Sequence, residues 1–243
     1  MYKFIKRTAD IFISLFGLII LAPVFLIVSI AIKIDSKGPV IFKQERVGKN
    51  GKIYNMYKFR SMKINSEHTG TGVYSMKDDP RVTKVGKFIR ATSIDEFPQF
   101  VNILKGDMSL IGPRPVLTYY PKKWEEYTAE ELKRFEVRPG VTGWAAVHGR
   151  KTNTVEARFA YDNYYVENLS LKLDFKIFFM TIKSVLTNAD NEDITSGESE
   201  NKENDITETA VVETATEKAE EVAVTETATE QEEKDAGVED AKN

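Results

Sequence analysis

Residues 86–115 read GKFIRATSIDEFPQFVNILKGDMSLIGPRP, and the rest of the chain is organised around them. Apolar residues recur here at helical spacing, at Ile94, Phe97, Val101 and Leu104. This spacing predicts an amphipathic helix from about Ser93 to Lys105 that ends at Gly106. Two adjacent carboxylates, Asp95 and Glu96, then lie in its first turn.

The paired carboxylates have two interpretations. Ser93 and Glu96 fit a capping box, and the helix dipole would favour Asp95 beside them. In the functional interpretation, the free N–H groups of a helix start suit phosphate oxygens, and Arg90 and Arg114 flank the same stretch. The residues alone leave both interpretations open.

Prolines shape this stretch as well. Pro98 falls inside the predicted helix, where a missing backbone donor loosens the first turns. Pro113 and Pro115 fix their own φ, and Pro115 disfavours the helical region for Arg114. An arginine on such a stiff, extended support suits a diphosphate, although an ordinary proline-rich turn has the same pattern.

The charge of the chain is unevenly distributed. The sequence has 243 residues with a net charge of −3, but residues 188–243 hold 19 acidic and 4 basic residues, which leaves residues 1–187 at +12. A basic body suits phosphates, nucleotides or an anionic membrane surface. The absence of cysteine excludes disulfides and thiolate metal sites. Composition predicts three parts: a membrane segment (1–34), a basic domain (35–187) and a disordered acidic tail (188–243).

The N-terminal segment contains an uncharged apolar run of 22 residues, Ile11–Ile32. That length suffices to cross a bilayer as a helix. Both flanks are basic, however, so the positive-inside rule favours cytoplasmic placement of both ends. Pro23 lies near the middle and can turn the helix back. We therefore favour a re-entrant helix-break-helix over a full crossing, with a cleaved signal peptide as a further alternative.

The next segment predicts a β-hairpin. Asn50-Gly51 is a hairpin turn signal between strands at 40–47 and 52–62. Lys58 and Arg60 share one face of the second strand. They could lie beside a phosphate site or on a solvated strand edge.

After the hairpin, the spacing of apolar residues is less regular. Residues 63–79 predict a mobile polar loop, and 121–135 predict an exposed acidic helix. Residues 137–150, VRPGVTGWAAVHGR, form a glycine-rich loop containing Arg138, which could cradle a nucleotide-sugar or simply fold around its tryptophan. The helix around 171–185 has a phenylalanine-rich face with lysines away from its centre, typical of an interfacial membrane element or of a core helix.

Taken together, these motifs resemble the bacterial sugar transferases, the monotopic polyprenyl-phosphate phosphoglycosyl transferases. The resemblance covers residues 1–186. The motifs that carry it are KRTAD, KQERVGKNGK, YKFRSM, DDPRVTKVGKFIRATSIDEFPQFVNILKGDMSLIGPRP, VRPGVTGWAAVHGR and YYVENLSLKLDFKIF. The chain resembles the minimal catalytic form of the family, without an additional N-terminal membrane domain.

The resemblance implies a fold and a setting. The fold would be α+β and mainly helical, with a re-entrant helix bent at Pro23, a small β-hairpin and amphipathic interfacial helices. The catalytic domain would lie on the cytoplasmic face of a bacterial cell membrane. The partners would be a UDP-sugar, polyprenyl phosphate and downstream glycosyltransferases of exopolysaccharide, capsule or glycoconjugate assembly, with no nucleic acid.

It also implies a covalent mechanism. Asp95 would attack the β-phosphorus of the UDP-sugar and release UMP, and polyprenyl phosphate would then accept the phosphosugar. Glu96 would act as a magnesium ligand or as a base, with Mg²⁺ held by Asp95 and Glu96. The residues implied in binding the diphosphate or donor are Lys58, Arg60, Arg90, Arg114 and Arg138.

The sequence departs from the family pattern in places. Ala22-Pro23 replaces a common Ser-Pro, and TGWAAVHGRK replaces the common TGWAQVNGRN, which puts the identity of the sugar in doubt. An inactive membrane-bound scaffold that binds nucleotide-sugar or lipid phosphate is the alternative function. A soluble phosphate-binding domain behind a cleaved signal peptide is a third.

Overall fold

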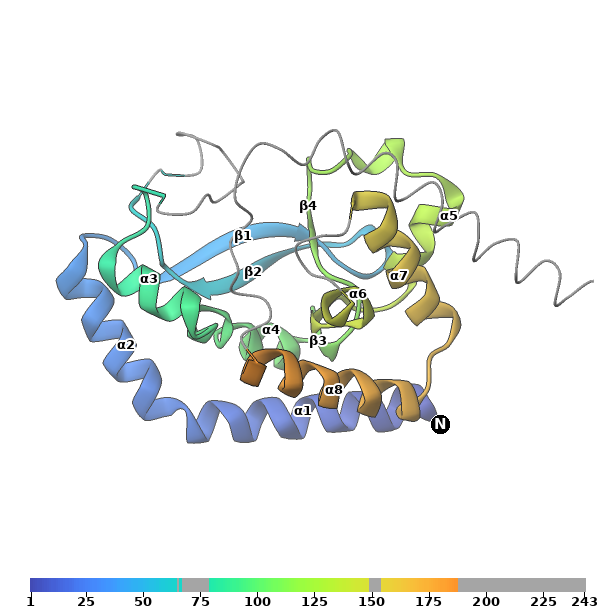
Figure 1. Ribbon diagram of the computed structural model, residues 1–243, viewed down its shortest axis with the longest axis horizontal. Coiled ribbons are helices and arrows are strands. Elements are labelled where there is room, and N and C mark those ends of the chain that lie inside the picture. The colour runs from blue at the N-terminus through green and yellow to red at the C-terminus, as the bar shows by residue number, and fades with distance from the viewer. Residues whose placement is uncertain (65, 67–78, 149–153, 188–243) are drawn as a thin grey trace, which may run out of the picture. The chain divides into compact units, whose positions relative to one another are not determined.

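The computed structural model describes residues 1–64, 66, 79–148 and 154–187 (Figure 1). The predictions for a mobile loop at 63–79 and for a disordered tail at 188–243 therefore lie wholly or mostly outside the described residues. The longer helices are α1 (Tyr2–Ile20), α2 (Ala22–Asp35), α3 (Lys84–Ala91), α4 (Gln99–Lys105), α7 (Val155–Glu167) and α8 (Leu171–Thr187). Shorter helices are α5 (Ala129–Leu132) and α6 (Trp144–Val147), with 3-10 turns η1 (Lys49–Gly51), η3 (Ile94–Glu96), η4 (Trp124–Glu126) and η5 (Lys133–Glu136).

Two small sheets complete a mainly helical α+β fold, as predicted. One has the order β2-β1-β4 and is antiparallel, with strands β1 (Ile41–Val47), β2 (Ile53–Phe59) and β4 (Val116–Leu117). The other pairs β3 (Ser109–Ile111) with β5 (Gly140–Thr142) in parallel. The β1–β2 turn uses positive φ at Asn50 (55°) and Gly51 (77°), which confirms the predicted hairpin.

The N-terminal apolar run forms two helices with a bend of 60° between them. The break falls at Leu21, and Pro23 lies in the first turn of α2, where its missing N–H costs least. Leu21 N–H donates to Gly17 O and Phe25 N–H donates to Leu21 O, both at 2.9 Å, so the hydrogen-bond ladder continues on either side of the bend. The predicted helix-break-helix is confirmed.

Both arms of this bent pair are attached to the same folded body (Figure 1). Near the start of α1, Arg7 donates to Ile103 O and Leu104 O at the end of α4. Near the end of α2, Ile32 is 1% exposed and packs in a core cluster with Ile89 of α3. A helix that crossed a bilayer would separate its ends by about 30 Å of hydrocarbon. These contacts therefore support a re-entrant arrangement.

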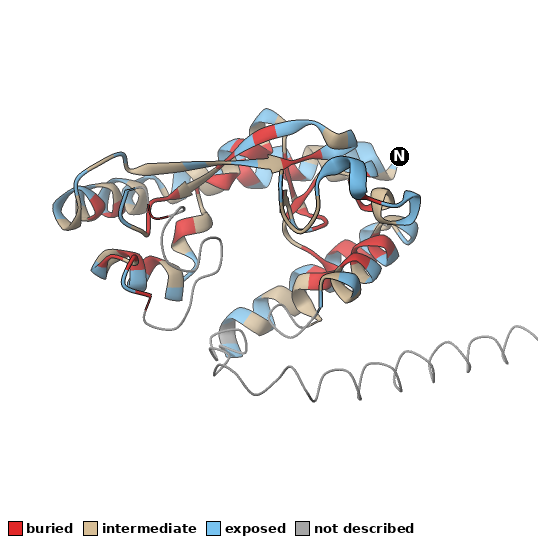
Figure 2. Ribbon diagram, turned by 90° about the horizontal axis from the view of Figure 1, so that it is seen from above, coloured by how far each residue is buried: buried red, intermediate tan, exposed pale blue. Residues whose placement is uncertain are grey.

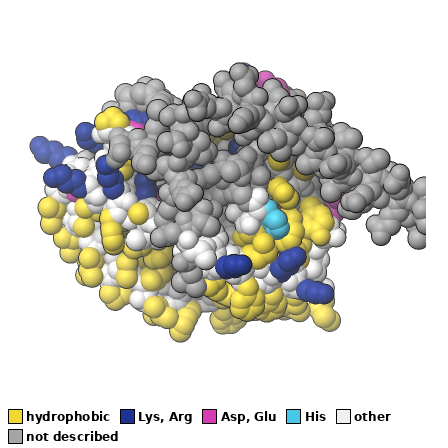
Figure 3. Space-filling model, viewed as in Figure 1, with side chains coloured by type: hydrophobic (Ala, Val, Ile, Leu, Met, Phe, Trp, Pro, Cys, Tyr) yellow, Lys and Arg dark blue, Asp and Glu magenta, His cyan; other side chains and the backbone are white. Residues whose placement is uncertain are grey.

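Among the described helices, no single one is long and apolar enough to cross a bilayer, whereas α1 and α2 together reach that length and composition. Many of their apolar side chains are exposed, including Phe4, Phe12, Phe16, Ile19, Ile20, Leu26 and Ile27. Hydrophobic side chains gather along this side of the molecule (Figure 3). An exposed apolar surface of this extent is typical of a membrane or protein interaction site.

Helix α8 contributes to the same kind of surface. Its predicted apolar face is exposed, with Phe175 62% and Phe178 49% accessible, while Ile177 on the other side is fully buried. The interpretation as an ordinary core helix is therefore wrong for the phenylalanine-rich face, because the core takes only the side with Ile177. The buried residues concentrate where helices and strands face one another (Figure 2).

The predicted continuous helix at 121–135 is also wrong. The chain there forms η4, α5 and η5 in succession. Thr128 begins α5 with a capping box, in which its hydroxyl accepts from Glu131 N–H and the Glu131 carboxylate accepts from Thr128 N–H. A new helix start at this position divides the segment into short pieces.

Candidate active site

The paired carboxylates lie in a tight connection between α3 and α4. Ser93, the residue before η3, has φ 55° and ψ 15°, and its side chain caps nothing. The capping-box interpretation is therefore wrong, because an N-cap needs extended backbone to turn its oxygen towards the helix. Pro98 separates η3 from α4, so the observed helix begins later than predicted. Its predicted end at Gly106 is confirmed, where φ is 89°. Positive φ at a serine is costly, and such backbone strain is enriched at functional sites.

Cations lie beside these carboxylates. Asp95 is 9% exposed. Lys58 Nζ forms an ion pair of 2.8 Å with Glu96 Oε1, in a half-buried setting. The Arg90 guanidinium lies near enough to Asp95 to interact with it electrostatically, and its Nε donates to Ser61 Oγ at 2.9 Å. Burial lowers the pKa of Arg90, and the charges of Asp95 and Asp79 oppose that shift.

Arg60, the neighbour of Lys58 on the predicted strand face, is directed elsewhere. Its guanidinium donates to the carbonyl oxygens of Ser36 and Lys37, both at 2.7 Å, and to Ser36 Oγ at 2.9 Å. The side chain is 5% exposed. Arg60 therefore holds the connection after α2, and the structure does not bring it together with the carboxylates.

Arg114 lines a separate cavity of about 90 Å³. Four arginines contribute to this cavity, together with aromatic and apolar side chains: Arg46, Arg114, Arg134 and Arg158. In the hairpin, Lys58 of β2 pairs with Phe42 of β1, and Arg46 lies four residues after Phe42 in β1. At about 3.3 Å per residue, that separation is roughly 13 Å. The structure thus places Arg114 and Asp95 towards opposite ends of the hairpin.

Arg138 lies at the far end of α4. Its Nε donates to Gly106 O at 2.7 Å, beside the two α4 carbonyls that Arg7 binds. Cations at a helix C-terminus satisfy free carbonyl groups and oppose the helix dipole. Arg138 therefore serves to fix the end of α4, and it is not adjacent to Asp95.

Comparison with known proteins shows the family of the chain. Residues 1–188 match the family model described as bacterial sugar transferase. The chain belongs to the bacterial sugar transferase family. Within this family it is 45% identical over 189 residues to a UDP-N-acetylgalactosamine-undecaprenyl-phosphate N-acetylgalactosaminephosphotransferase of Aeromonas hydrophila, over 76% of this chain and 44% of that protein.

Other bacterial sugar transferases are similarly close. The UDP-glucose:undecaprenyl-phosphate glucose-1-phosphate transferase of Escherichia coli K12 is 40% identical, over 74% of this chain and 40% of that protein. The exopolysaccharide production protein PSS of Rhizobium leguminosarum bv. phaseoli is 43% identical, over 75% of this chain and 96% of that protein. The chain thus spans less than half of the first two relatives and nearly all of the third.

Sequence reasoning missed several residues that support the candidate site. Asn102 is fully buried on α4, accepts from Tyr57 N–H at 2.9 Å and donates to Asn55 O at 2.7 Å, which ties α4 to β2. A polar residue on the inner side of a predicted helix is a usable signal for such a tie. Asp79 and Arg81 form a buried ion pair, which sequence reasoning also missed.

The predicted Mg²⁺ ligands, Asp95 and Glu96, can be compared with the ligands that Mg²⁺ usually has in proteins. Among the described residues, no group of three or more His, Cys, Asp or Glu side chains could hold a metal ion. Mg²⁺ commonly uses one or two carboxylates and takes its remaining oxygens from water and substrate phosphates. Asp95 and Glu96, as adjacent oxygen donors, fit that role but not a closed protein site.

Proposed function

We propose that the protein transfers a sugar 1-phosphate from a UDP-sugar to polyprenyl phosphate, with release of UMP. The observation that carries this proposal is a largely buried carboxylate, Asp95, in a strained turn beside Arg90, in a chain of the bacterial sugar transferase family. Relatives named for this type of reaction share two fifths or more of the aligned residues, at 45% and 40% identity.

In the first step, an oxygen of Asp95 attacks the β-phosphorus of the donor. The bond from the β-phosphorus to the bridging oxygen breaks, and UMP leaves with that oxygen and its electron pair. The product on the protein is a sugar-phosphoryl aspartate. Arg90 is suited to neutralise the phosphoryl oxygens, because phosphoryl transfer depends mostly on positioning and charge stabilisation.

In the second step, a phosphate oxygen of the polyprenyl phosphate attacks the same phosphorus. The bond to Asp95 breaks, the carboxylate is restored, and the lipid leaves as a polyprenyl diphosphate sugar. Glu96 is available as the base that takes a proton from the acceptor phosphate, and its ion pair with Lys58 fixes its position. Asp95 and Glu96 would hold Mg²⁺, which would supply further neutralisation of the diphosphate charge.

The other predicted phosphate ligands fall into two groups. Lys58 and Arg90 are next to the carboxylates and remain our candidates for the diphosphate. Arg114 stays a predicted ligand of the donor, but its distance along the hairpin suits a part of an extended nucleotide-sugar remote from the reacting phosphorus. Arg60 and Arg138 are less suited, since both terminal nitrogens of Arg60 donate to the backbone of Ser36 and Lys37 and Arg138 Nε donates to Gly106 O at the far end of α4.

For the setting, we propose that α1 and α2 re-enter the cytoplasmic face of a bacterial cell membrane and that α8 lies at its surface. The exposed apolar residues of all three helices and the attachment of both arms to one body support this arrangement. Relatives of comparable identity are named for different sugars. We therefore propose that the donor is a UDP-sugar and that the reaction stands at the start of polysaccharide or glycoconjugate assembly.

The test uses the full chain purified in detergent, with polyprenyl phosphate, Mg²⁺ and a panel of UDP-sugars, scored by UMP formed. We expect Asp95→Asn to abolish UMP release and Glu96→Gln to reduce it. Glu125→Gln makes the same change from carboxylate to amide at an exposed position in η4, and this control should retain activity. Mass spectrometry of protein quenched with its donor should locate the phosphosugar on Asp95. Activity in Asp95→Asn, or an adduct on another residue, would refute the assignment.

A further inference from the structure

A second cavity, of about 70 Å³, lies beside the first half of α1. Side chains from α1, the hairpin turn, β3, the segment before β5 and α7 line it. It includes five cationic side chains and two carboxylates: Lys3, Lys6, Arg7, Lys49, Arg138, Asp10 and Glu136. One water molecule needs roughly 10–15 Å³ of such space, so the cavity can hold a larger group.

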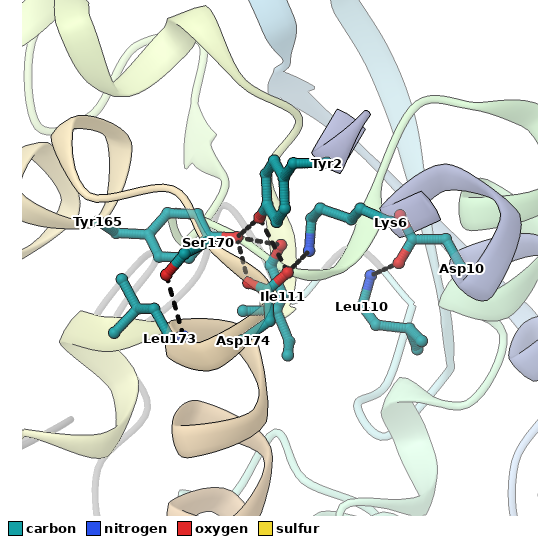
Figure 4. A network of polar contacts seen from close by, with 9 residues as sticks. All are labelled: Tyr2, Lys6, Asp10, Leu110, Ile111, Tyr165, Ser170, Leu173 and Asp174. Atoms are coloured by element: carbon teal, nitrogen blue, oxygen red, sulfur yellow. Dashed lines mark hydrogen bonds and ion pairs between the residues drawn. The ribbon is translucent and has the colours of Figure 1, made fainter. Parts of the chain in front are cut away.

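One wall of this cavity is a fixed polar network (Figure 4). Asp174 Oδ2 accepts from Tyr2 Oη at 2.8 Å and from Lys6 Nζ at 3.1 Å, while Tyr165 Oη lies 2.8 Å from Asp174 Oδ1. The Asp10 carboxylate accepts from Leu110 N–H at 3.0 Å. The charge of Lys6 is thereby matched within the wall. The remaining two lysines and two arginines exceed the two carboxylates, Asp10 and Glu136, by two charges, so the cavity has a net positive charge.

A buried hydroxyl also lines the cavity. Ser109 is 2% exposed, and its Oγ has no hydrogen-bond partner within the described part of the chain. A buried polar atom without a partner costs free energy of folding, so such atoms usually bind water or a ligand. A hydroxyl group and several cations around one cavity suit an anion with more than one acceptor oxygen.

The cavity is remote from the proposed reaction. Arg7 and Arg138, which line it, bind carbonyls at the end of α4, whereas Asp95 precedes the start of that helix. Seven residues of helix span about 10 Å. A group in this cavity would therefore not contact the reacting atoms.

The cavity is close to an apolar surface instead. Lys3, Lys6 and Arg7 follow helical spacing and share the side of α1 that lines the cavity. Phe4 and Ile5, which are 76% and 40% exposed, lie on the opposite side of α1, away from the cavity. A helix with one apolar side and one cationic side lies in a membrane surface with its cations at the level of the lipid phosphate groups, which suits a phospholipid as the source of the phosphate.

We propose that this cavity binds the phosphate group of an anionic phospholipid and so fixes the start of α1 against the folded body. Lys3, Lys49 and Ser109 would contact the phosphate, and Arg7 and Arg138 would add charge. The site is separate from the binding of the polyprenyl phosphate acceptor at Asp95. A phospholipid headgroup and inorganic phosphate share an anionic phosphate with several acceptor oxygens, so both could bind here.

The test measures binding, independently of catalysis. The full chain in detergent micelles is titrated with phosphatidylglycerol, and bound lipid is counted by native mass spectrometry. Lys49→Gln and Ser109→Ala should each weaken binding about tenfold, as expected for loss of a hydrogen bond to a charged group. Lys52→Gln removes the same charge from the same hairpin turn outside the cavity and should change affinity less than about twofold.

Two further controls test the identity of the ligand. Phosphatidylcholine of the same chain length should bind more weakly, and competition by excess inorganic phosphate would assign the site to free phosphate in place of lipid. Equal affinities in Lys49→Gln, Lys52→Gln and the unchanged protein would overturn the proposal. So would a Ser109→Ala variant with altered thermal stability but unaltered lipid affinity, because the hydroxyl would then serve a bound water only.

Discussion

Gly86 offers a sharp test of how the candidate active site is supported. It is buried in α3, and a Cβ added there would lie 1.9 Å from Ser61 O and 2.7 Å from Ser61 C. Real Cβ atoms essentially never approach closer than 3.0 Å, so Gly86→Ala requires the backbone of Ser61 to move by roughly 1 Å. No flexible side chain can absorb that displacement, because the contacted atoms are backbone.

The displacement would reach the carboxylates through Arg90. Ser61 O accepts from Thr83 N–H at 3.0 Å, and Ser61 Oγ accepts from Arg90 Nε at 2.9 Å. A misplacement of about 1 Å in a positioning group can cost on the order of 100-fold in rate. We therefore expect Gly86→Ala to lower kcat for UMP release about 100-fold and to lower Tm.

Helix propensity alone predicts the opposite sign, since Gly→Ala inside a helix usually stabilises by about 1 kcal/mol. The assay compares kcat and Tm for Gly86→Ala, for the exposed α3 control Lys84→Ala and for Ser61→Ala, which removes only the hydroxyl. Ser61→Ala should fold normally and lose part of the activity, which keeps the test informative if Gly86→Ala fails to fold. A Gly86→Ala variant with unchanged kcat and a higher Tm would refute the reasoning.

Two further predictions concern pH and topology. Hydrogen bonds from Arg81 lower the pKa of Asp79 to about 2, so this carboxylate stabilises the fold above about pH 4 and loses that contribution as pH falls towards 2. Comparing the free energy of unfolding of Asp79→Asn and the unchanged protein should give a difference of roughly 2 kcal/mol at pH 7 that shrinks over this window. For topology, Lys3→Cys and Lys37→Cys in this cysteine-free chain should both resist an impermeant external thiol reagent, whereas labelling of position 3 alone would indicate a full crossing.

Features set by local chemistry could be predicted from the sequence. The hairpin turn at Asn50-Gly51, the end of α4 at Gly106 and the break before Pro23 all follow from backbone preferences of the residues themselves. The exposed side of α8 could be recognised as amphipathic but not as exposed, because periodicity shows that two faces differ and not which neighbour covers them.

The partners of the arginines could not be predicted. Arg60 binds carbonyls 23 and 24 residues away, Arg138 binds one 32 residues away, and Arg7 binds carbonyls 96 and 97 residues away. A sequence shows where a positive charge lies, but the backbone oxygens that receive it carry no sequence signal. Arginines that fix loops and arginines that can bind phosphate therefore look alike until the fold is known.

Two Ser/Thr-x-x-Glu patterns within the described part of the chain make the same point about helix caps. Thr128 and Glu131 form a capping box, while Ser93 and Glu96 do not. The difference lies in the backbone, which is extended at Thr128 (φ −70°, ψ 163°) and left-handed at Ser93. Ser93 follows α3 almost directly and its N–H donates to Arg90 O, so the chain must reverse there before η3 can begin.

Helix α4 links the N-terminal helices to the carboxylates. Its end is held by Arg7 of α1, its middle is tied to β2 by Asn102, and the turn before its start carries Asp95. Seven residues of helix form a stiff connection. The position of α1 therefore determines where Asp95 lies relative to the membrane surface that we propose. An enzyme whose donor is soluble and whose acceptor is a lipid needs this alignment, because both substrates must meet the same carboxylate.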